Sequence, residues 1–221
     1  MKRKFVGITG EIGSGKSYLS DLIVERCGHH YIEAHNIDFD KIAHNIYEDE
    51  FDLWGVRSEL KKYFPGVVIK HKSGNVFYEE VDRKLLGDLV FNQPEKLEEL
   101  NQIMSEPIRN EYNSIIKNKG GLILINSSLI AEHNMFDLCG GKCILVNVNE
   151  EIQFSRLRAR GLTDKKIKKM LSSQLTNAEK HKVLVNAKIK MSYVFSNEYL
   201  KKFNKEIDII KNFIFNKGDL L

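Results

Sequence analysis

The sequence contains few of the residues that cross-link a chain or direct it to a membrane. Its 221 residues include only 3 prolines and 3 cysteines. An odd cysteine count without an export signal argues against a disulfide framework, and no second Cys or His pair at zinc spacing accompanies Cys139 and Cys143. No apolar run approaches the roughly 18 residues of a membrane span, and residues 1–4 (MKRK) lead into no signal-peptide segment. We therefore expect free thiols in a cytoplasmic protein that does not bind membranes.

Charge of one sign is not concentrated anywhere in the chain. Lys and Arg number 34 against 30 Asp and Glu, which gives a net charge of +4, and no block of five or six basic residues occurs. Charge alone therefore does not indicate nucleic-acid binding, and the H-E-x-x-H pattern of zinc proteases is absent. With 42% hydrophobic residues, the chain is typical of a globular protein with a sizeable core. We expect a small-molecule substrate and no nucleic-acid partner; the oligomeric state is not predicted.

One stretch near the start carries a recognisable chemistry. Residues 10–17 (GEIGSGKS) follow the apolar run 5–8 and precede the helix-compatible run 18–26, so strand, loop and helix stand in the order of a phosphate-binding loop. Glycines let the backbone approach a phosphate, and the N–H groups of the loop and of the helix start point at the anion. A flexible Gly/Ser turn would predict neither the Lys-Ser pair nor the flanking elements.

The phosphate loop predicts a bound nucleotide with its metal ion. Lys16 is expected along the β- and γ-phosphates of ATP, and the hydroxyl of Ser17 is expected to hold Mg²⁺. The residues expected to bind the nucleotide are Gly10, Glu11, Ile12, Gly13, Ser14, Gly15, Lys16, Ser17 and Tyr18.

The remaining apolar segments predict an α/β fold. We expect a P-loop NTPase with three layers (αβα) around a parallel five-stranded sheet, because several of these segments are the continuous apolar runs of strands buried on both faces. The expected strands are residues 5–8, 31–37, 121–125, 142–149 and 193–195. An amphipathic helix at residues 206–215 is expected to close the core.

Two acidic residues follow the second expected strand. Ligands of open α/β sheets bind beyond the carboxyl ends of the strands, so Asp38 and Asp40 should share a rim with the phosphate loop. The same pair also fits a helix N-cap with a first-turn acid, because residues 40–46 continue with helical spacing.

Changes in composition along the sequence divide the chain into three parts. Residues 1–48, 120–152 and 183–221 are expected to form the nucleotide-binding core. Residues 49–119 read as a helical insertion that binds the phosphoryl acceptor, and residues 153–182 read as a lid.

Four arginines are candidates for contacts with anionic groups. Arg83 and Arg109 lie in the insertion and are the candidate acceptor contacts. Arg156 and Arg160 lie four apart on an expected helix, which places both guanidinium groups on one face. Such a face is either a solvated surface or a lid that meets the charge developing on a transferring phosphoryl group, and we favour the lid.

Several separated motifs together resemble one family, the dephospho-coenzyme A kinases, which use ATP to phosphorylate the ribose 3′-hydroxyl of dephospho-CoA. The resemblance extends to about residue 174. The motifs that carry it are residues 7–17, 37–44, 81–85 with 90–91, and 100–103 with 108–109, then Gln153, Arg156, Arg160 and Gln174. It implies that Asp40 is the catalytic aspartate, acting with Lys16, Arg156 and Arg160, and that Asp38, Arg83 and Arg109 contact the substrate.

The chain departs from the pattern of this family at several positions. Asn126 stands where the family usually has Asp, Ser128 where it has Pro, and Tyr18 where it has Thr. Residues 105–106 (SE) replace an expected His-Pro pair, and Ser192 replaces an acid.

The leading hypothesis is an ATP- and Mg²⁺-dependent small-molecule kinase acting on dephospho-CoA in coenzyme A biosynthesis. A first alternative keeps the fold and changes the acceptor, for example to a nucleoside monophosphate, because helical insertions of P-loop kinases select the acceptor. A second alternative is a nucleotide-binding regulatory protein without transfer activity, which Asn126 and Tyr18 suggest. The joint presence of Lys16, Ser17 and Asp40 argues against the second.

Overall fold

The computed structural model describes residues 3–74, 76–90, 93–195 and 213–214. The described chain divides into two compact units, Met1–Asp38 with Lys119–Leu221 and Phe39–Asn118. The helix α2 (Phe39–Glu48), which the sequence pattern places with the core, therefore belongs to the second unit. Within the described residues, no helix combines the length and the hydropathy that crossing a membrane requires.

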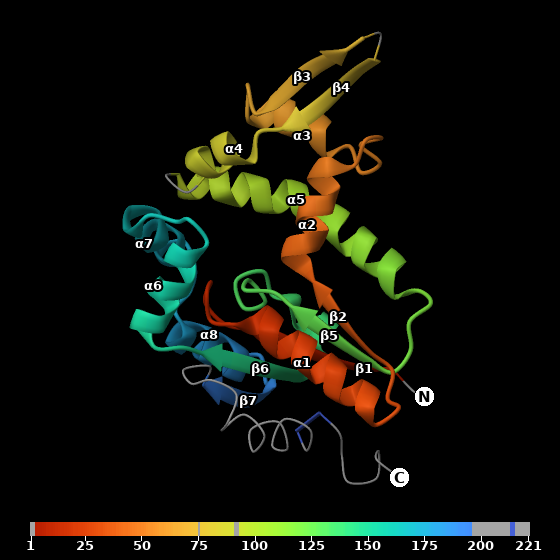
Figure 1. Ribbon diagram of the computed structural model, residues 1–221, viewed down its shortest axis with the longest axis vertical. Coiled ribbons are helices and arrows are strands. Elements are labelled where there is room, and N and C mark those ends of the chain that lie inside the picture. The colour runs from red at the N-terminus through yellow and green to blue at the C-terminus, as the bar shows by residue number, and fades with distance from the viewer. Residues whose placement is uncertain (1–2, 75, 91–92, 196–212, 215–221) are drawn as a thin grey trace. The chain divides into compact units, whose positions relative to one another are not determined.

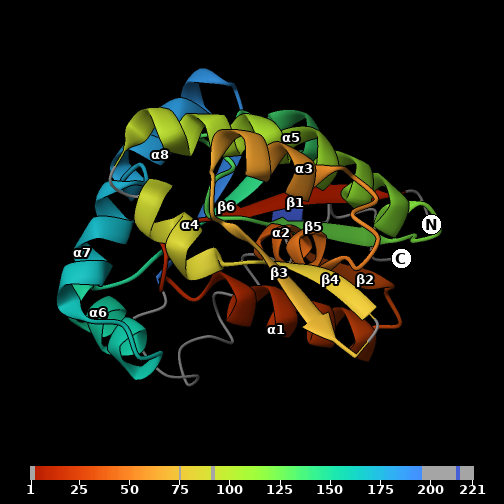
Figure 2. The ribbon, with the colours of Figure 1, turned by 90° about the horizontal axis from the view of Figure 1, so that it is seen from above.

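The first unit is built on a sheet whose described strands are all parallel, as the sequence predicted. The five strands have the order β2-β5-β1-β6-β7 (Figure 1). Their bounds are β1 (Lys4–Thr9), β2 (Ala34–Asp38), β5 (Leu122–Asn126), β6 (Lys142–Asn147) and β7 (Lys190–Phe195). The helices α1 (Lys16–His29) and α8 (Asn177–Asn186) lie on opposite faces of this sheet, which gives the expected three layers (Figure 2).

The strand β5 is buried along its whole length. All five residues of β5 are buried, which explains the continuous apolar run in its sequence. Leu122 and Leu124 pack with Ile8 of β1 against Leu19 and Ile23 of α1. Burying one such side chain stabilises the fold by about 1.5–3 kcal/mol. The packed core of the sheet and α1 therefore supports the loop that joins β1 to α1.

The register of the strands brings three chain segments to one edge of the sheet. Asn126, the last residue of β5, pairs with Ile8 of β1 on one side and with Asp38 of β2 on the other. Because the strands are parallel, their carboxyl ends meet at this edge, and the phosphate loop begins there directly after Thr9.

The lid region predicted at residues 153–182 is helical in the structure and belongs to the first unit. It contains α6 (Glu150–Ala159), α7 (Asp164–Ser172) and the start of α8, and Figure 2 shows α6 beside α7. The amphipathic helix predicted at residues 206–215 lies outside the described residues except for Phe213 and Ile214. Ile214 is buried in the core that contains α1.

The second unit combines helices with an antiparallel hairpin. The predicted helical insertion also contains a hairpin that the sequence analysis did not predict, formed by β3 (Val68–Ser73) and β4 (Val76–Val81). Most side chains of both strands are exposed or half-buried, so the alternation of apolar and polar residues that marks a strand is weak. The helices of this unit are α2, α3 (Val56–Tyr63), α4 (Arg83–Val90) and α5 (Pro94–Ile116).

Candidate active site

The loop between β1 and α1 has a backbone conformation that favours glycine at its key positions. Gly10, Gly13 and Gly15 have φ angles of 145°, 79° and 97°. A Cβ atom on Gly10 would lie 2.4 Å from the carbonyl oxygen of Val146, so the loop also packs against β6 too closely for a side chain. This close turn leads into the N-terminus of α1, where helix N–H groups favour an anion.

Lys16 lies across the loop that precedes it. Its Nζ donates to the carbonyl oxygens of Gly10, at 3.0 Å, and Glu11, at 3.1 Å, and the residue is buried. The ammonium group is therefore held at the mouth of the loop by neutral acceptors. A phosphate oxygen in their place would accept charge-assisted hydrogen bonds, which are roughly twice as strong.

A hydroxyl, a carboxylate and an amide meet at the edge of the sheet. Ser17 Oγ donates to Asp38 Oδ2 at 3.4 Å, and Asn126 Nδ2 donates to Ser17 Oγ at 3.2 Å. The register of β2 and β5 makes this cluster, because Asp38 and Asn126 are direct partners. The sequence predicted Asp38 as a substrate contact, whereas the structure brings it to the hydroxyl predicted to hold Mg²⁺. Hydroxyl and carboxylate oxygens suit Mg²⁺, so the residues present fit this ion.

Three of the predicted site residues belong to the second unit. Asp40 is exposed in the first turn of α2, two residues after Asp38. Arg83 is exposed at the start of α4, and its Nη2 lies 4.0 Å from Glu48 Oε1. Arg109 is exposed on α5.

The structure treats the two lid arginines differently. Arg156 Nη1 donates to the carbonyl oxygens of Ser14, at 3.1 Å, and Gly13, at 3.4 Å. Arg160 is exposed at the C-cap of α6, just beyond the last helical residue. The structure therefore brings Arg156 to the phosphate loop and leaves Arg160 at the surface.

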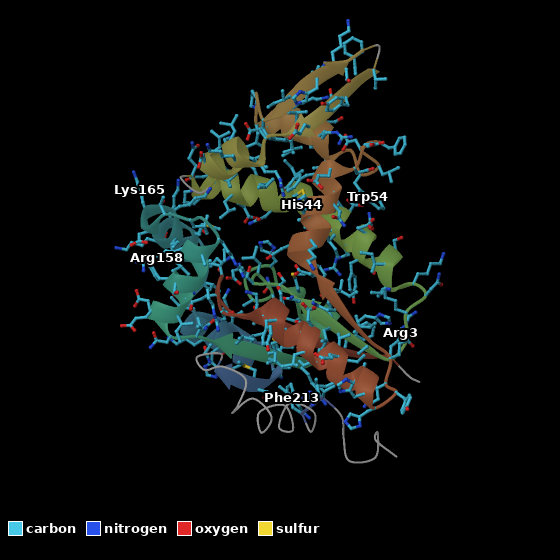
Figure 3. The ribbon with its side chains drawn as sticks, in the orientation of Figure 1. Arg3, His44, Trp54, Arg158, Lys165 and Phe213 are labelled. Carbon is cyan, nitrogen blue, oxygen red and sulfur yellow. The ribbon has the colours of Figure 1, made fainter. Side chains whose placement is uncertain are left out.

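The two lid helices are joined by an ion pair. Arg158 of α6, labelled in Figure 3, binds both carboxylate oxygens of Asp164, the first residue of α7, at 2.7 and 2.9 Å. These hydrogen bonds lower the pKa of Asp164 and raise that of Arg158. Both side chains are about half exposed, so the pair orients the helices and contributes little stability.

Side chains from the lid region also hold the backbone of the phosphate loop. The N–H groups of Glu11 and Ile12 donate to Asn177 Oδ1 and Gln174 Oε1, both at 3.2 Å. The buried Gln153 donates from Nε2 to the carbonyl oxygen of Ile12 at 2.8 Å. The side-chain amides of these three residues fix the first half of the loop. The backbone N–H groups of residues 11 and 12 therefore already donate to protein oxygens.

Sequence reasoning missed two of the residues that surround the loop. Thr176 forms a capping box with Glu179, which is the pattern of an ordinary helix start. Asn177, the residue after Thr176, therefore does not stand out in the sequence as a residue that contacts the loop. Lys180 reads as one more surface lysine, yet it is fully buried. Burial raises the pKa of Glu11, and the positive charges of Lys180 and Lys16 oppose this shift.

Comparison with known proteins agrees with this site. Residues 4–190 match the family model described as "Dephospho-CoA kinase". A dephospho-CoA kinase of Fusobacterium nucleatum is 33% identical over 184 residues, which cover 82% of this chain and 86% of the relative. A dephospho-CoA kinase of Aquifex aeolicus is 30% identical over 184 residues, which cover 82% of this chain and 85% of the relative.

A solved structure shows the same fold. The crystal structure of TT1252 from Thermus thermophilus superposes with a TM-score of 0.72 and covers 98% of this chain and 100% of that chain, at 23% sequence identity. The match to the family model, the similarity to the two kinases and the phosphate loop at the carboxyl edge of a parallel sheet point to one assignment. The chain belongs to the dephospho-CoA kinase family.

Proposed function

We propose that this protein transfers the γ-phosphoryl group of ATP to the ribose 3′-hydroxyl of dephospho-CoA, giving coenzyme A and ADP. The observation that carries the proposal is the phosphate loop, with Lys16 buried across it and Ser17 at its end, in a chain that matches the kinase family over residues 4–190. Phosphoryl transfer depends on positioning and on charge stabilisation, which these residues supply.

Lys16 and Arg156 are proposed to bind the donor. Both cations hydrogen-bond carbonyl oxygens of the loop, so they stand next to the place where a triphosphate enters. On binding, each exchanges a neutral carbonyl oxygen for a charged phosphate oxygen, which favours the nucleotide complex. Arg160, exposed at the end of α6, is proposed to add positive charge over the transferring group.

Ser17 and Asp38 are proposed to hold Mg²⁺. Bound Mg²⁺ neutralises charge on the β- and γ-phosphate oxygens. Ser17 supplies a hydroxyl oxygen, and Asp38 supplies the carboxylate that the chain lacks at position 126. Asn126 donates to the Ser17 hydroxyl and so orients its lone pairs. The charge of this metal site therefore comes from β2 and not from β5.

Asp40 is proposed to orient the acceptor hydroxyl and to accept its proton. Its exposed position in the first turn of α2 leaves the carboxylate accessible to a substrate. Arg83 and Arg109, both exposed in the second unit, are proposed to contact anionic groups of the acceptor. A positioned general base contributes roughly 10²–10⁴-fold to the rate.

The test is ADP release with Mg-ATP against a panel that holds dephospho-CoA and the common nucleoside monophosphates, with Lys16→Ala as the blank. Turnover on dephospho-CoA alone is the expected result. Turnover only on a nucleotide would contradict the assigned acceptor and keep the donor site. ATP binding without turnover on any acceptor would contradict the kinase activity itself.

A further inference from the structure

A fully buried lysine forms an ion pair that joins α8 to the segment after β5. Lys180 of α8 has no exposed surface, and its Nζ pairs with Glu132 Oε1 and donates to the carbonyl oxygen of Ser128 at 2.7 Å. Burial lowers the pKa of Lys180, and the negative charge of Glu132 opposes this shift. Fully buried lysines are rare unless they are paired, and replacing such a pair by apolar residues is often neutral for stability. The pair therefore calls for a role beyond stability.

The ion pair fastens the turn between α7 and α8 to the segment that follows β5. Glu132 Oε1 also accepts the backbone N–H of Leu175 at 3.0 Å. Gln174 Nε2, from the residue before it, donates to Ser128 Oγ at 3.3 Å. The carbonyl of Ser128, which binds Lys180, lies 3.5 Å from Thr9 Oγ1 at the end of β1.

Lys180 lies in α8 close in sequence to the two residues that hold the loop amides, Asn177 at the start of α8 and Gln174 in the connection before it. We call Gln174, Asn177 and Lys180 the 174–180 clamp. Its first two members accept the N–H groups of Ile12 and Glu11, and the third anchors the turn through Glu132. A further hydrogen bond holds the side chain of Asn177, because its Nδ2 donates to Asn147 Oδ1 at 2.7 Å. The position of the loop thus depends on where the ion pair holds the turn.

We propose that Lys180 is a positioning residue for the donor nucleotide: its ion pair with Glu132 sets the 174–180 clamp on the amides of Glu11 and Ile12. The proposal rests on the kinase activity proposed above. It predicts that Lys180 controls the affinity for Mg-ATP and has little effect on the affinity for the acceptor.

The experiment separates positioning from folding with matched variants. Lys180→Met alone removes the cation that pairs with the largely buried Glu132 carboxylate and is expected to lower the melting temperature. The double variant Glu132→Gln/Lys180→Met removes both charges and is expected to fold, as judged by circular dichroism. Lys182→Met removes an exposed lysine from the same helix and serves as the control.

The decisive readout is the Kd for Mg-ATP measured by titration calorimetry without any acceptor. The folded double variant is expected to bind about tenfold more weakly than the wild type, with an unchanged KM for the acceptor, and the control is expected to bind normally. A normal Kd in the folded double variant would overturn the proposal.

The same titration distinguishes this proposal from the proposed function. A wild-type protein that binds Mg-ATP but does not turn over dephospho-CoA would contradict the acceptor assignment and leave the role of Lys180 to be decided by the variants. A wild-type protein that does not bind Mg-ATP would overturn both.

Discussion

Replacing Asn126 by Asp tests the proposed arrangement of the metal site. Asn126 and Asp38 both hydrogen-bond Ser17 Oγ, at 3.2 and 3.4 Å, so a carboxylate at position 126 would lie within about 7 Å of that of Asp38. At an effective dielectric constant of about 20, two unit charges at that distance repel by about 2 kcal/mol, and water screening lowers this value. Asn126→Asp should therefore destabilise the metal-free protein by about 1–2 kcal/mol.

The assay is thermal unfolding with and without Mg²⁺. For a chain of this size, the expected loss lowers the melting temperature by roughly 2–8 °C in chelator, and Mg²⁺ should restore it because the ion sits between the carboxylates. Asn118→Asp, the same substitution at an exposed position, is the control and should respond little. Equal melting temperatures of wild type and Asn126→Asp in chelator, with no added effect of Mg²⁺, would refute the placement of the metal site between Ser17, Asp38 and Asn126.

Three further predictions follow from the geometry. Asp40→Asn should lower kcat by roughly 10²–10⁴-fold while calorimetry shows an unchanged Kd for Mg-ATP, and near-normal turnover would exclude Asp40 as the base. Arg156→Ala should lower kcat/KM for Mg-ATP by about 10- to 100-fold and more than Arg160→Ala does, because only Arg156 is seen to contact the loop; the reverse order would contradict that role. The hydroxyl of Thr176 lowers the pKa of Glu179, so the contribution of this capping box is present above the ordinary pKa of a glutamate and lost as the pH falls through the lowered value. Glu179→Gln should therefore lower the melting temperature at neutral pH and by progressively less as the pH falls below the ordinary pKa of a glutamate, and a loss that does not change with pH would refute this linkage.

The sheet and the phosphate loop are predictable because their signals are local. The runs that form β1 and β5 are apolar over their whole length, and residues 10–17 place glycines, Lys16 and Ser17 at fixed offsets. The rule that ligands bind at the carboxyl ends of parallel strands also brought Asp38 to the correct edge.

The parts that were not predicted depend on contacts between distant segments. Glu132 and Lys180 are 48 positions apart, and no local pattern marks either of them as a member of a buried pair. The hydrogen bond between Asp38 and Ser17 was not predicted, because it arises from the register of the strands. The difference between the two lid arginines depends on where one helix ends, which is the least predictable property of an element.

The hairpin of the second unit was not predicted from the sequence for a different reason. A strand is recognised when one of its faces is buried, and most residues of β3 and β4 are at least partly exposed. Phe77 and Tyr78 of β4 are more than half exposed, so their hydrophobicity does not report a core position. Gly74, between the two strands, has a φ of 60°, a conformation that favours glycine.

The most direct test of the central claim is to identify the product formed from Mg-ATP and dephospho-CoA. Phosphorus NMR and mass spectrometry of the product are expected to show coenzyme A, with the new phosphate on the ribose 3′-oxygen and one ADP formed per product molecule. The Lys16→Ala protein should form none. ADP release without a phosphorylated dephospho-CoA, or phosphate transfer to another hydroxyl, would contradict the proposed function.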